Sequence, residues 1–398
     1  MRPGRRDTDL PAPTMAALAL AYAVAPLATD MYLSAFPRMT RELGTSATGI
    51  QLTLTAFMTG LALGQLVIGP LSDRWGRRRP LLTGTGTSVL AGVLCALAPN
   101  VGLLVGARFA QGFSGAAGIV VARAVVGDRA RGTGAARAFG LLMMIAGVAP
   151  VVAPLAGGTL VDAIGWRGIF LVLAGLAALT FVGALTLVPE TLPAGQRHSS
   201  DTLRRMGALL TDRVFVGYVL AFAFGFGVLF SFLAASPFVY QNVYGFPVEA
   251  YGVALAVTAF GFTGTSALNR RIVPRFGARR LLCVGLTVMG TCSAVLCLLA
   301  ATGLLVRPVA VPLIFVAVSS LGLVAANATA LAVGRAPQSA GSASAMLGGS
   351  QFGLAAVVSP LVGLGGEHTA LPMAAAMVTS ALVAGAAVTF LARDAAEG

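Results

Sequence analysis

The chain has 398 residues, of which 57% are hydrophobic and only 10% are charged, and its mean hydropathy is +0.86. A soluble domain carries about 25% charged residues because water must wet its surface, so this composition excludes an ordinary soluble protein and indicates a lipid surrounding. The net charge of +13 arises from 27 basic residues, all arginine, clustered between apolar runs as in membrane-protein loops. This clustering argues against a nucleic-acid partner.

The first apolar run extends from about 14 to 36 and follows Arg2, Arg5 and Arg6. It is too long for the apolar core of a secretory signal and contains Asp30, so we interpret it as an uncleaved membrane helix. Charged or Pro/Gly-rich breaks delimit further segments of roughly 20 residues, the length that spans a bilayer. They are predicted near 48–71, 80–98, 101–126, 137–160, 166–188, 213–236, 248–269, 280–301, 307–333, 340–363 and 370–392.

One long charged break, residues 189–212, lies almost midway and separates six predicted helices from six. We therefore expect an N-terminal bundle over 1–188, a cytoplasmic linker over 189–212 and a C-terminal bundle over 213–398. The predicted fold class is an all-α integral membrane protein with twelve transmembrane helices in two six-helix bundles.

Two sequence repeats indicate that the bundles are pseudo-symmetric. RWGRRRPLL at 74–82 resembles RFGARRLL at 275–282, and their glycines are 201 residues apart. GVAPVVAPL at 147–155 resembles GLAAVVSPL at 353–361, with an offset of 206 residues. Duplicated halves around a site at the bilayer midplane are the architecture of secondary transporters.

The distribution of arginine predicts the orientation. If the N-terminus is cytoplasmic, 22 arginines fall on the cytoplasmic side and Arg108 lies within a helix. The four on the other side are Arg38, Arg41, Arg167 and Arg307. Because cytoplasmic loops carry the excess of arginine, both termini are expected in the cytoplasm.

Asp30 is the only one of the 14 acidic residues that lies clearly inside a predicted membrane helix. A lone carboxylate at membrane depth costs at least about 2.5 kcal/mol on insertion scales, which makes it a candidate proton carrier. The alternative is a structural carboxylate near the outer interface. Arg108 is expected at a similar depth, roughly 10 Å below the same surface, and Gln111 follows it by one turn on the same helix face.

No metal site is predicted. The four cysteines lie in apolar segments without a metal-binding spacing, and the two histidines fall in predicted loops.

The loop GPLSDRWGRRRPL at 69–81 is more specific than a simple membrane anchor requires. Gly69 and Pro70 interrupt the helix, Asp73 can stabilise a helix N-terminus, and Gly76 permits a tight turn. The Asp-x-x-Gly-Arg spacing therefore suggests a function beyond positive-inside anchoring.

This loop resembles a signature motif of the major facilitator superfamily. The matching residues are Gly69, Leu71, Ser72, Asp73, Arg74, Gly76, Arg77 and Arg78. ARFAQGFSGAA at 107–117, followed by Asp128, resembles the helix-four motif of that family. GVAPVVAPLAGG at 147–158 resembles the helix-five antiporter motif, with Ala149 where glycine is common.

ATDMYLSAFP at 28–37 is similar to the helix-one signature of the bicyclomycin-resistance drug-efflux subfamily, with Ser34 where proline is usual. Segments 231–242, 326–333 and 340–353 also resemble the second half of that subfamily, so the likeness covers nearly the whole chain.

The resemblance implies roles for individual residues. Asp30 would carry the proton and Arg108 would be coupled to it. Asp73, Arg77 and Asp128 would form a cytoplasmic charge latch that stabilises the outward-facing state. The helix-five residues expected to permit bending and close packing are Gly147, Pro150, Pro154, Gly157 and Gly158.

A substrate cavity is expected to use polar groups, which membrane interiors rarely hold without function, and adaptable methionines. The candidates are Tyr32, Gln111, Met143, Met144, Phe230, Asn327 and Gln351. A structural role is an open alternative for each of them.

The resemblance implies a monomeric, proton-driven antiporter that exports small amphipathic drug-like compounds across the bacterial cytoplasmic membrane. It would need no cofactor other than the proton gradient and would not be an enzyme. An alternative is a transporter of the same fold for a metabolite such as an amino acid or a sugar derivative. A membrane enzyme is disfavoured because no Ser/His pair or paired membrane carboxylates are present, and a receptor because there is no sizeable soluble domain.

Overall fold

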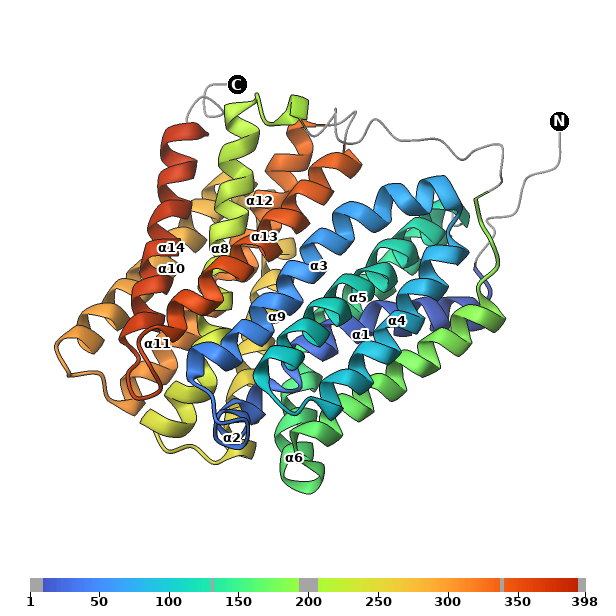
Figure 1. The fold of residues 1–398 in the computed structure, drawn as a ribbon. Coiled ribbons are helices and arrows are strands. Elements are labelled where there is room, and N and C mark those ends of the chain that lie inside the picture. The colour runs from blue at the N-terminus through green and yellow to red at the C-terminus, as the bar shows by residue number, and fades with distance from the viewer. Residues whose placement is uncertain (1–9, 130–131, 193–206, 337–339, 393–398) are drawn as a thin grey trace.

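The computed structural model describes residues 10–129, 132–192, 207–336 and 340–392, and within these ranges its regular secondary structure is entirely helical (Figure 1). Of the described helices, 11 have the length and apolar composition needed to cross a membrane. One of these spans, Val148–Leu187, has 40 residues, which at 1.5 Å per residue is about twice the thickness of a bilayer.

That long span contains two membrane crossings. It lies in α6 (Gly132–Leu187), where Gly165 has non-helical backbone angles with a φ of 68° that reverses the chain. A positive φ suits glycine because it has no Cβ. The described helices therefore agree with the predicted all-α architecture of twelve crossings.

The N-terminal half consists of α1 to α6. Its other helices are α1 (Ala12–Asp30), η1 (Leu33–Ala35), α2 (Phe36–Glu42), α3 (Ala47–Trp75), α4 (Arg78–Leu97) and α5 (Val101–Arg129). The first crossing, predicted as one helix over 14–36, is interrupted directly after Asp30 and continues through η1 and α2.

The C-terminal half consists of α8 to α14. Its helices are α8 (Arg213–Phe238), η3 (Val239–Val243), α9 (Val248–Phe276), α10 (Ala278–Ala301), α11 (Arg307–Ser319), α12 (Leu321–Arg335), α13 (Ala340–Gly363), α14 (Leu371–Ala386) and η5 (Ala387–Leu391). Figure 1 shows α1–α6 gathered on one side of the molecule and α8–α14 on the other. Most of the predicted linker, residues 193–206, lies outside the described residues.

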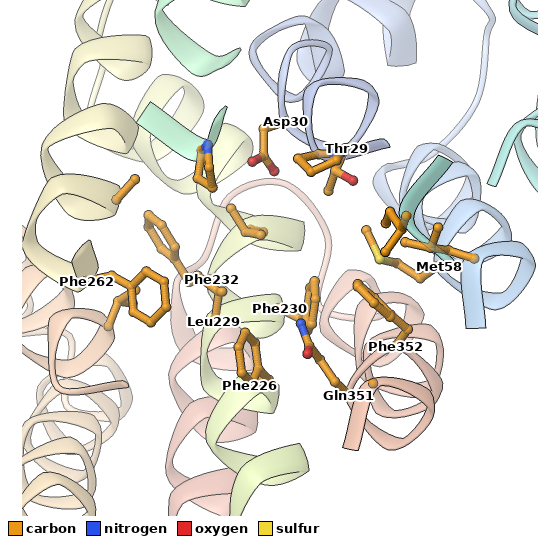
Figure 2. Close-up of a pocket in the computed structure, with 18 of the residues that line it drawn as sticks. Thr29, Asp30, Met58, Phe226, Leu229, Phe230, Phe232, Phe262, Gln351 and Phe352 are labelled. Carbon is orange, nitrogen blue, oxygen red and sulfur yellow. The ribbon is translucent and has the colours of Figure 1, made fainter. Parts of the chain in front are cut away.

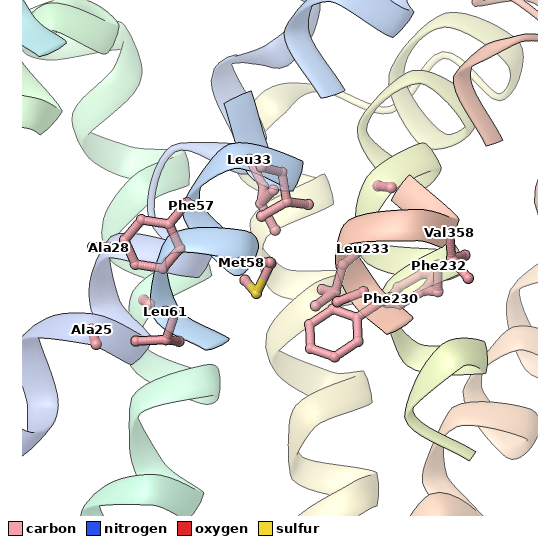
Figure 3. Packing of buried hydrophobic residues seen from close by; sticks show 14 of the residues in the cluster. Ala25, Ala28, Leu33, Phe57, Met58, Leu61, Phe230, Phe232, Leu233 and Val358 are labelled. Atoms are coloured by element: carbon pink, nitrogen blue, oxygen red, sulfur yellow. The ribbon is translucent and has the colours of Figure 1, made fainter. Parts of the chain in front are cut away.

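We call the end of the molecule that carries the turns at Gly76 and Gly277 the arginine-rich face, because arginines cluster at both turns. They are Arg74, Arg77, Arg78 and Arg79 at the first turn and Arg275, Arg279 and Arg280 at the second. The other end, which carries the turns at Gly44 and Gly165, is the opposite face. The two halves contact each other mainly through two pairs of helices, α3 with α13 and α6 with α9. Figure 3 shows Met58 and Leu61 of α3 across from Phe230 and Leu233 of α8.

The halves are joined most tightly toward the opposite face. The Gln51 amide donates to the Ala234 carbonyl at 2.9 Å, and the Gln241 amide donates to the Ser34 carbonyl at 3.1 Å. Ser359 also lies 3.5 Å from the Gln51 carbonyl oxygen. These three bonds all lie on the side of Asp30 that is away from the arginine-rich face, so the molecule is sealed there.

Candidate functional site

A cavity of about 330 Å³ lies between the two halves. Its N-terminal wall comes from α1, α3, α5 and α6, and its C-terminal wall from α8, α9, α11 and α13. Figure 2 shows Asp30 and Thr29 at one end of this space and Gln351 on the far wall. A volume of this size is sufficient for a drug-like small molecule, for which pockets of about 300–1,000 Å³ are usual.

Asp30 is the carboxylate of this cavity. It is the last residue of α1 and is only 6% exposed, yet its side chain lines the cavity. Among the described residues, its Oδ1 atom has no hydrogen-bond partner. A buried, unpaired carboxylate is energetically unfavourable, so this group has a strong tendency to bind a proton or a cationic partner.

Close backbone packing holds Asp30 in position. A Cβ atom on Gly157 of α6 would overlap the carbonyl oxygen of Met31, the residue that follows Asp30. The neighbouring Gly158 packs instead against Val248 and Gly252 of α9. The paired glycines therefore let α6 contact the end of α1 on one side and the C-terminal half on the other.

The C-terminal wall is largely aromatic. Phe226 and Phe230 of α8 lie with ring centroids 6.2 Å apart, and Phe230 lies 6.2 Å from Phe352 of α13. Phe232 and Phe262 also line the cavity. The polar groups on this wall include Thr258 and Gln351. The wall is therefore suited to the apolar body of a ligand, because aromatic rings supply large, rigid contact areas.

Arg108 lies behind the cavity and does not pair with Asp30. Its side chain is fully buried, and one terminal nitrogen donates to Gln111 Oε1 at 2.6 Å. The guanidinium carbon lies 4.2 Å from the centroid of the Tyr32 ring and 4.1 Å from that of Phe57. Within the described part of the chain, no carboxylate lies within ion-pair distance of Arg108. The guanidinium is held instead by the attraction between its charge and the aromatic faces.

The cavity wall differs from the set expected from the sequence. Phe230 and Gln351 do line it. Tyr32 and Gln111 do not, because they hold Arg108, and Asn327 does not, because it is bonded to Asn269 at 2.7 Å. Met144 is 57% exposed and does not line this cavity. Met143 and Gly147 lie in a stretch of α6 outside the described side chains.

Sequence reasoning missed several residues of the N-terminal wall, among them Tyr22, Gln65 and Arg123. Arg123 lies at the end of the predicted 101–126 helix and was counted with the 22 cytoplasmic arginines; in the structure it lies within α5, almost two turns before the end of the helix at Arg129. The signal available in the sequence was the presence of a glutamine and an arginine inside long apolar runs, the same signal that identified Asp30.

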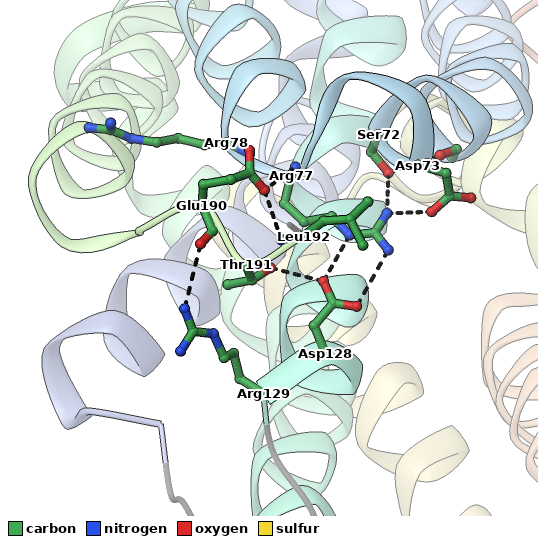
Figure 4. A network of polar contacts seen from close by, with 10 residues as sticks. Ser72, Asp73, Arg77, Arg78, Asp128, Arg129, Glu190, Thr191 and Leu192 are labelled. Carbon is green, nitrogen blue, oxygen red and sulfur yellow. Dashed lines mark hydrogen bonds and ion pairs between the residues drawn. The ribbon is translucent and has the colours of Figure 1, made fainter. Parts of the chain in front are cut away.

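A second polar site occupies the arginine-rich face (Figure 4). Arg77 donates to both carboxylate oxygens of Asp128, at 2.9 and 3.4 Å, and also bonds Asp73 and Ser72. Burial lowers the pKa of Arg77, but the hydrogen bonds to Asp128 and Asp73 outweigh burial and leave the pKa above its ordinary value. The structure thus brings together the three residues of the expected charge latch.

The other residues of the motif at 69–78 lie around this charge cluster and have different contacts. Gly69 accepts a hydrogen bond from Ser72 through its carbonyl, and Gly76 forms the turn with a φ of 89°. Arg78 donates to the Leu185 carbonyl at 2.7 Å. Arg74 lies in the last turn of α3 and is exposed.

Two residues that the sequence did not single out complete the charge cluster. Glu190 accepts hydrogen bonds from the backbone N–H groups of Arg77 and Arg78, at 2.9 and 3.3 Å, and thereby caps the start of α4. Thr191 donates to Asp128 at 2.9 Å. The chain after α6 is thus bound to the turn between α3 and α4.

The other helix-five residues connect the cavity to the contact between the halves. Pro150 lines the cavity, and the carbonyl of Pro154 lies against Gly252 of α9. Among the described residues, no cluster of three or more His, Cys, Asp or Glu side chains could hold a metal ion.

The chain resembles the solved structures of the nucleoside transporter NupG (TM-score 0.75, 12% identity, 95% of this chain and 99% of that chain covered) and of an inward-facing bacterial homologue of the human lysosomal transporter Spinster (TM-score 0.69, 18% identity, 96% and 95% covered). At these identities the likeness concerns the fold alone.

Two curated relatives cover most of the chain. An uncharacterized MFS-type transporter, YdgK of Bacillus subtilis (strain 168), is 39% identical over 370 residues, with 90% of each chain covered. A bicyclomycin resistance protein homolog of Haemophilus influenzae is 31% identical over 369 residues, with 92% of each covered. The family profile of the Major Facilitator Superfamily matches residues 18–360. The chain is therefore a multi-pass membrane protein that belongs to the Major Facilitator Superfamily.

Proposed function

We propose that this protein is a proton-coupled exporter of small amphipathic compounds across the bacterial cytoplasmic membrane. The observation that carries the proposal is the buried, unpaired carboxylate of Asp30 at the end of an aromatic cavity between the two halves. The relative named for bicyclomycin resistance supports a drug-like substrate, as do multidrug resistance proteins MdtL of Escherichia coli, which are 29% identical over 243 residues.

The sidedness of the proposal follows from charge. Cytoplasmic loops of membrane proteins carry the excess of arginine, so the arginine-rich face would be cytoplasmic. The bonds from Gln51 and Gln241 across the halves then seal the extracellular side. In this arrangement the cavity would receive its substrate from the cytoplasm or the inner leaflet.

Exchange of a proton for a substrate would follow from the cost of leaving Asp30 charged and alone. An ionised Asp30 attracts the positive or hydrogen-bond-donating end of a compound in the cavity. Once the cavity opens to the outside, an incoming proton neutralises the carboxylate and removes that attraction, so the compound leaves. The neutral carboxyl group is cheaper to bury, which favours the return of the empty carrier.

The charge cluster around Arg77 would hold the neighbouring N-terminal helices rigidly together. It is complete while the opposite face is sealed, and it joins α3, α4 and α5 to the chain after α6. We therefore propose that the cluster keeps the N-terminal helices together as one body through the cycle, in place of the outward-facing latch that the family resemblance implies. The contacts of α6 with α9 and of α3 with α13 would be the surfaces about which the halves rock.

The test is proton-driven transport by Asp30→Asn in proteoliposomes with an imposed pH gradient. The variant should lose at least about tenfold in transport of an amphipathic cation such as ethidium, because asparagine cannot take up the proton. The control is Glu367→Gln, which changes a surface carboxylate bonded to Asn242 and should transport normally. Full gradient-driven transport by folded Asp30→Asn would contradict the proposal.

A metabolite exporter of the same fold is distinguished in cells. Deletion of the gene should increase sensitivity to amphipathic drugs, and expression should restore resistance only while the proton gradient is intact. If sensitivity is unchanged but the export of an amino acid or sugar derivative falls, the substrate is that metabolite.

A further inference from the structure

We propose that the preferred substrates are zwitterions, with a cationic amine and a carboxylate at opposite ends of an apolar body. This inference rests on the proposed function and narrows its substrate class. It follows from three polar groups of the N-terminal wall, Asp30, Gln65 and Arg123, which all line the same cavity.

The end of the cavity at Asp30 is suited to a cation. Oδ1 of Asp30 is buried and has no partner in the described part of the chain. The cavity residues around it in Figure 2 are mostly apolar, including Phe232 and Leu229. A protonated amine would supply both the opposite charge and the missing hydrogen bond.

Gln65 requires an acceptor. Its Nε2 atom is buried and lacks a hydrogen-bond partner among the described residues, although the side chain lines the cavity. In this orientation of the amide the N–H₂ group is a donor only, so an oxygen acceptor on the ligand would satisfy it and a cationic amine would not.

Arg123 supplies a positive charge near the arginine-rich side of the cavity. One terminal nitrogen donates to the Tyr22 hydroxyl at 2.7 Å, and the guanidinium carbon lies 5.3 Å from the centroid of that ring. No carboxylate of the described residues forms an ion pair with it. Because guanidinium has five donors in a planar fork, most of its capacity is available to a ligand carboxylate.

The separation of the two charged residues sets the length of the ligand. Tyr22, which holds Arg123, and Asp30 are eight residues apart on α1, which corresponds to about 12 Å along the helix axis. Between them the cavity is lined by Pro26 and faces the rings of Phe226 and Phe230. A body of two linked aromatic rings with a charge at each end matches this arrangement.

Compounds with one charge fit less well. A lipophilic amine would pair with Asp30 but leave the donors of Gln65 and Arg123 unmatched. A lipophilic acid would bond Arg123 but would leave the Asp30 carboxylate without its counterion. The zwitterion is the only one of the three that matches all these groups.

The test uses three tritiated probes with the same two-ring body: 4'-(aminomethyl)biphenyl-4-carboxylic acid, 4-(aminomethyl)biphenyl and biphenyl-4-carboxylic acid. Binding to the purified full-length protein in detergent is measured at equilibrium. The zwitterion should bind at least about tenfold more tightly than either single-charge probe. Arg123→Gln should abolish this preference and leave amine binding within about twofold of the wild type, whereas Arg123→Lys should restore part of it.

Asp30→Asn should weaken binding of the zwitterion and the amine but not of the acid. Arg41→Gln, on the opposite face and outside the cavity, is the control and should bind all three probes as the wild type does. The inference is overturned if the amine binds wild type as tightly as the zwitterion does, or if Arg123→Gln weakens all probes equally.

Failure of the proposed function has a different signature. If the zwitterion binds with this preference but no probe is moved by a proton gradient in proteoliposomes, the cavity assignment stands and the exporter proposal fails. If the amine is transported by the gradient but the preference for the zwitterion is absent, the exporter proposal stands and the substrate class proposed here is wrong.

Discussion

The two halves of the molecule repeat a turn and most of its arginines, but not the ion pairs that Arg77 makes at the first turn. Gly76 ends α3 with a φ of 89°, and Gly277 ends α9 with a φ of 77°, at corresponding positions of the sequence repeat. At the first turn, Arg77 forms ion pairs with Asp73 of α3 and with Asp128 of α5. In the second half, Pro274 stands in the position that corresponds to Asp73.

The cavity shows the same division. Asp30, Gln65 and Arg123 come from the N-terminal half, whereas most of the aromatic rings come from the C-terminal half. A turn with positive φ needs glycine for steric reasons in both copies, so the glycine is retained. Side-chain charges have no such backbone constraint and can diverge after a duplication. The comparison suggests that coupling chemistry belongs to the N-terminal half and binding of the apolar substrate body to the C-terminal half.

The largest effect should come from breaking the charge cluster. Arg77→Gln leaves Asp128 and Asp73 without their cation, and breaking a largely buried pair costs about 3–5 kcal/mol. The matched change in the other half is Arg335→Gln, whose ion pair with Asp212 involves side chains that are 47% and 31% exposed. It should cost at most about 1 kcal/mol. Thermal unfolding in one detergent measures both, and equal losses would contradict the proposed asymmetry.

The next effect concerns one glycine of α6 and one of α13. Gly157 and Gly363 occupy corresponding positions in the repeat. A Cβ on Gly157 would overlap the backbone carbonyl of Met31, whereas one on Gly363 would overlap the side-chain oxygen of Gln51 and come close to the Cα of Thr48. Gly157→Ala should therefore destabilise the fold by about 2–3 kcal/mol, more than Gly363→Ala does.

Gly175→Ala provides the control in the next membrane crossing of α6, because nothing lies within 4 Å of its added Cβ. Unfolding temperatures and transport rates of the three variants should be compared. If Gly157→Ala transports at the rate of the Gly175→Ala variant, the close contact at Met31 does not position Asp30.

Much of the fold could be predicted from the sequence because lipid imposes a length on each apolar segment and requires its backbone hydrogen bonds to be made within the helix. The charge cluster was also predictable, since Asp73 and Arg77 are four residues apart and the motif includes Asp128. Glu190 and Thr191 were not, because their contacts depend on how the chain leaves α6.

The cavity was harder to predict for a physical reason. All faces of a membrane helix are apolar, so hydrophobic periodicity does not distinguish a lipid-facing side chain from a cavity-facing one. Met144 was expected inside but is exposed, and Asn327 is satisfied by Asn269 instead of a ligand. Arg123 was counted among the cytoplasmic arginines, because an arginine near a helix end matches the positive-inside pattern.

A smaller effect tests the aromatic wall. Phe230→Leu keeps an apolar side chain but removes the ring contacts with Phe226 and Phe352. It should remove the equivalent ring contact with a bound aromatic ligand as well. Loss of one aromatic contact is worth about 0.5–1.5 kcal/mol, so the affinity for a two-ring ligand should fall about three- to tenfold. Met58→Leu on the N-terminal wall is the control and should change it by less than about twofold. Equal effects on both walls would contradict the division of roles.

The smallest predicted effect concerns the seal between the halves. Gln241→Leu removes the bond from its amide to the Ser34 carbonyl, which joins η3 to the N-terminal half. A neutral hydrogen bond contributes about 1 kcal/mol, so the ratio of molecules open at the opposite face to molecules sealed there should rise about fivefold. The adjacent Asn242→Leu is the control, because Asn242 bonds Glu367 within the C-terminal half.

Spin labels at the exposed Ile164 and Leu364, on a background without the native cysteines, report the distance between the halves at the opposite face. Gln241→Leu should populate a longer distance, whereas Asn242→Leu should match the parent, because the bond from Asn242 to Glu367 lies within one half and does not join the two. Identical distance distributions for the two variants would mean that packing of α6 on α9 and of α3 on α13, rather than these hydrogen bonds, determines which face is open. In that case the glycine contacts, which act on the same surfaces, should control the equilibrium.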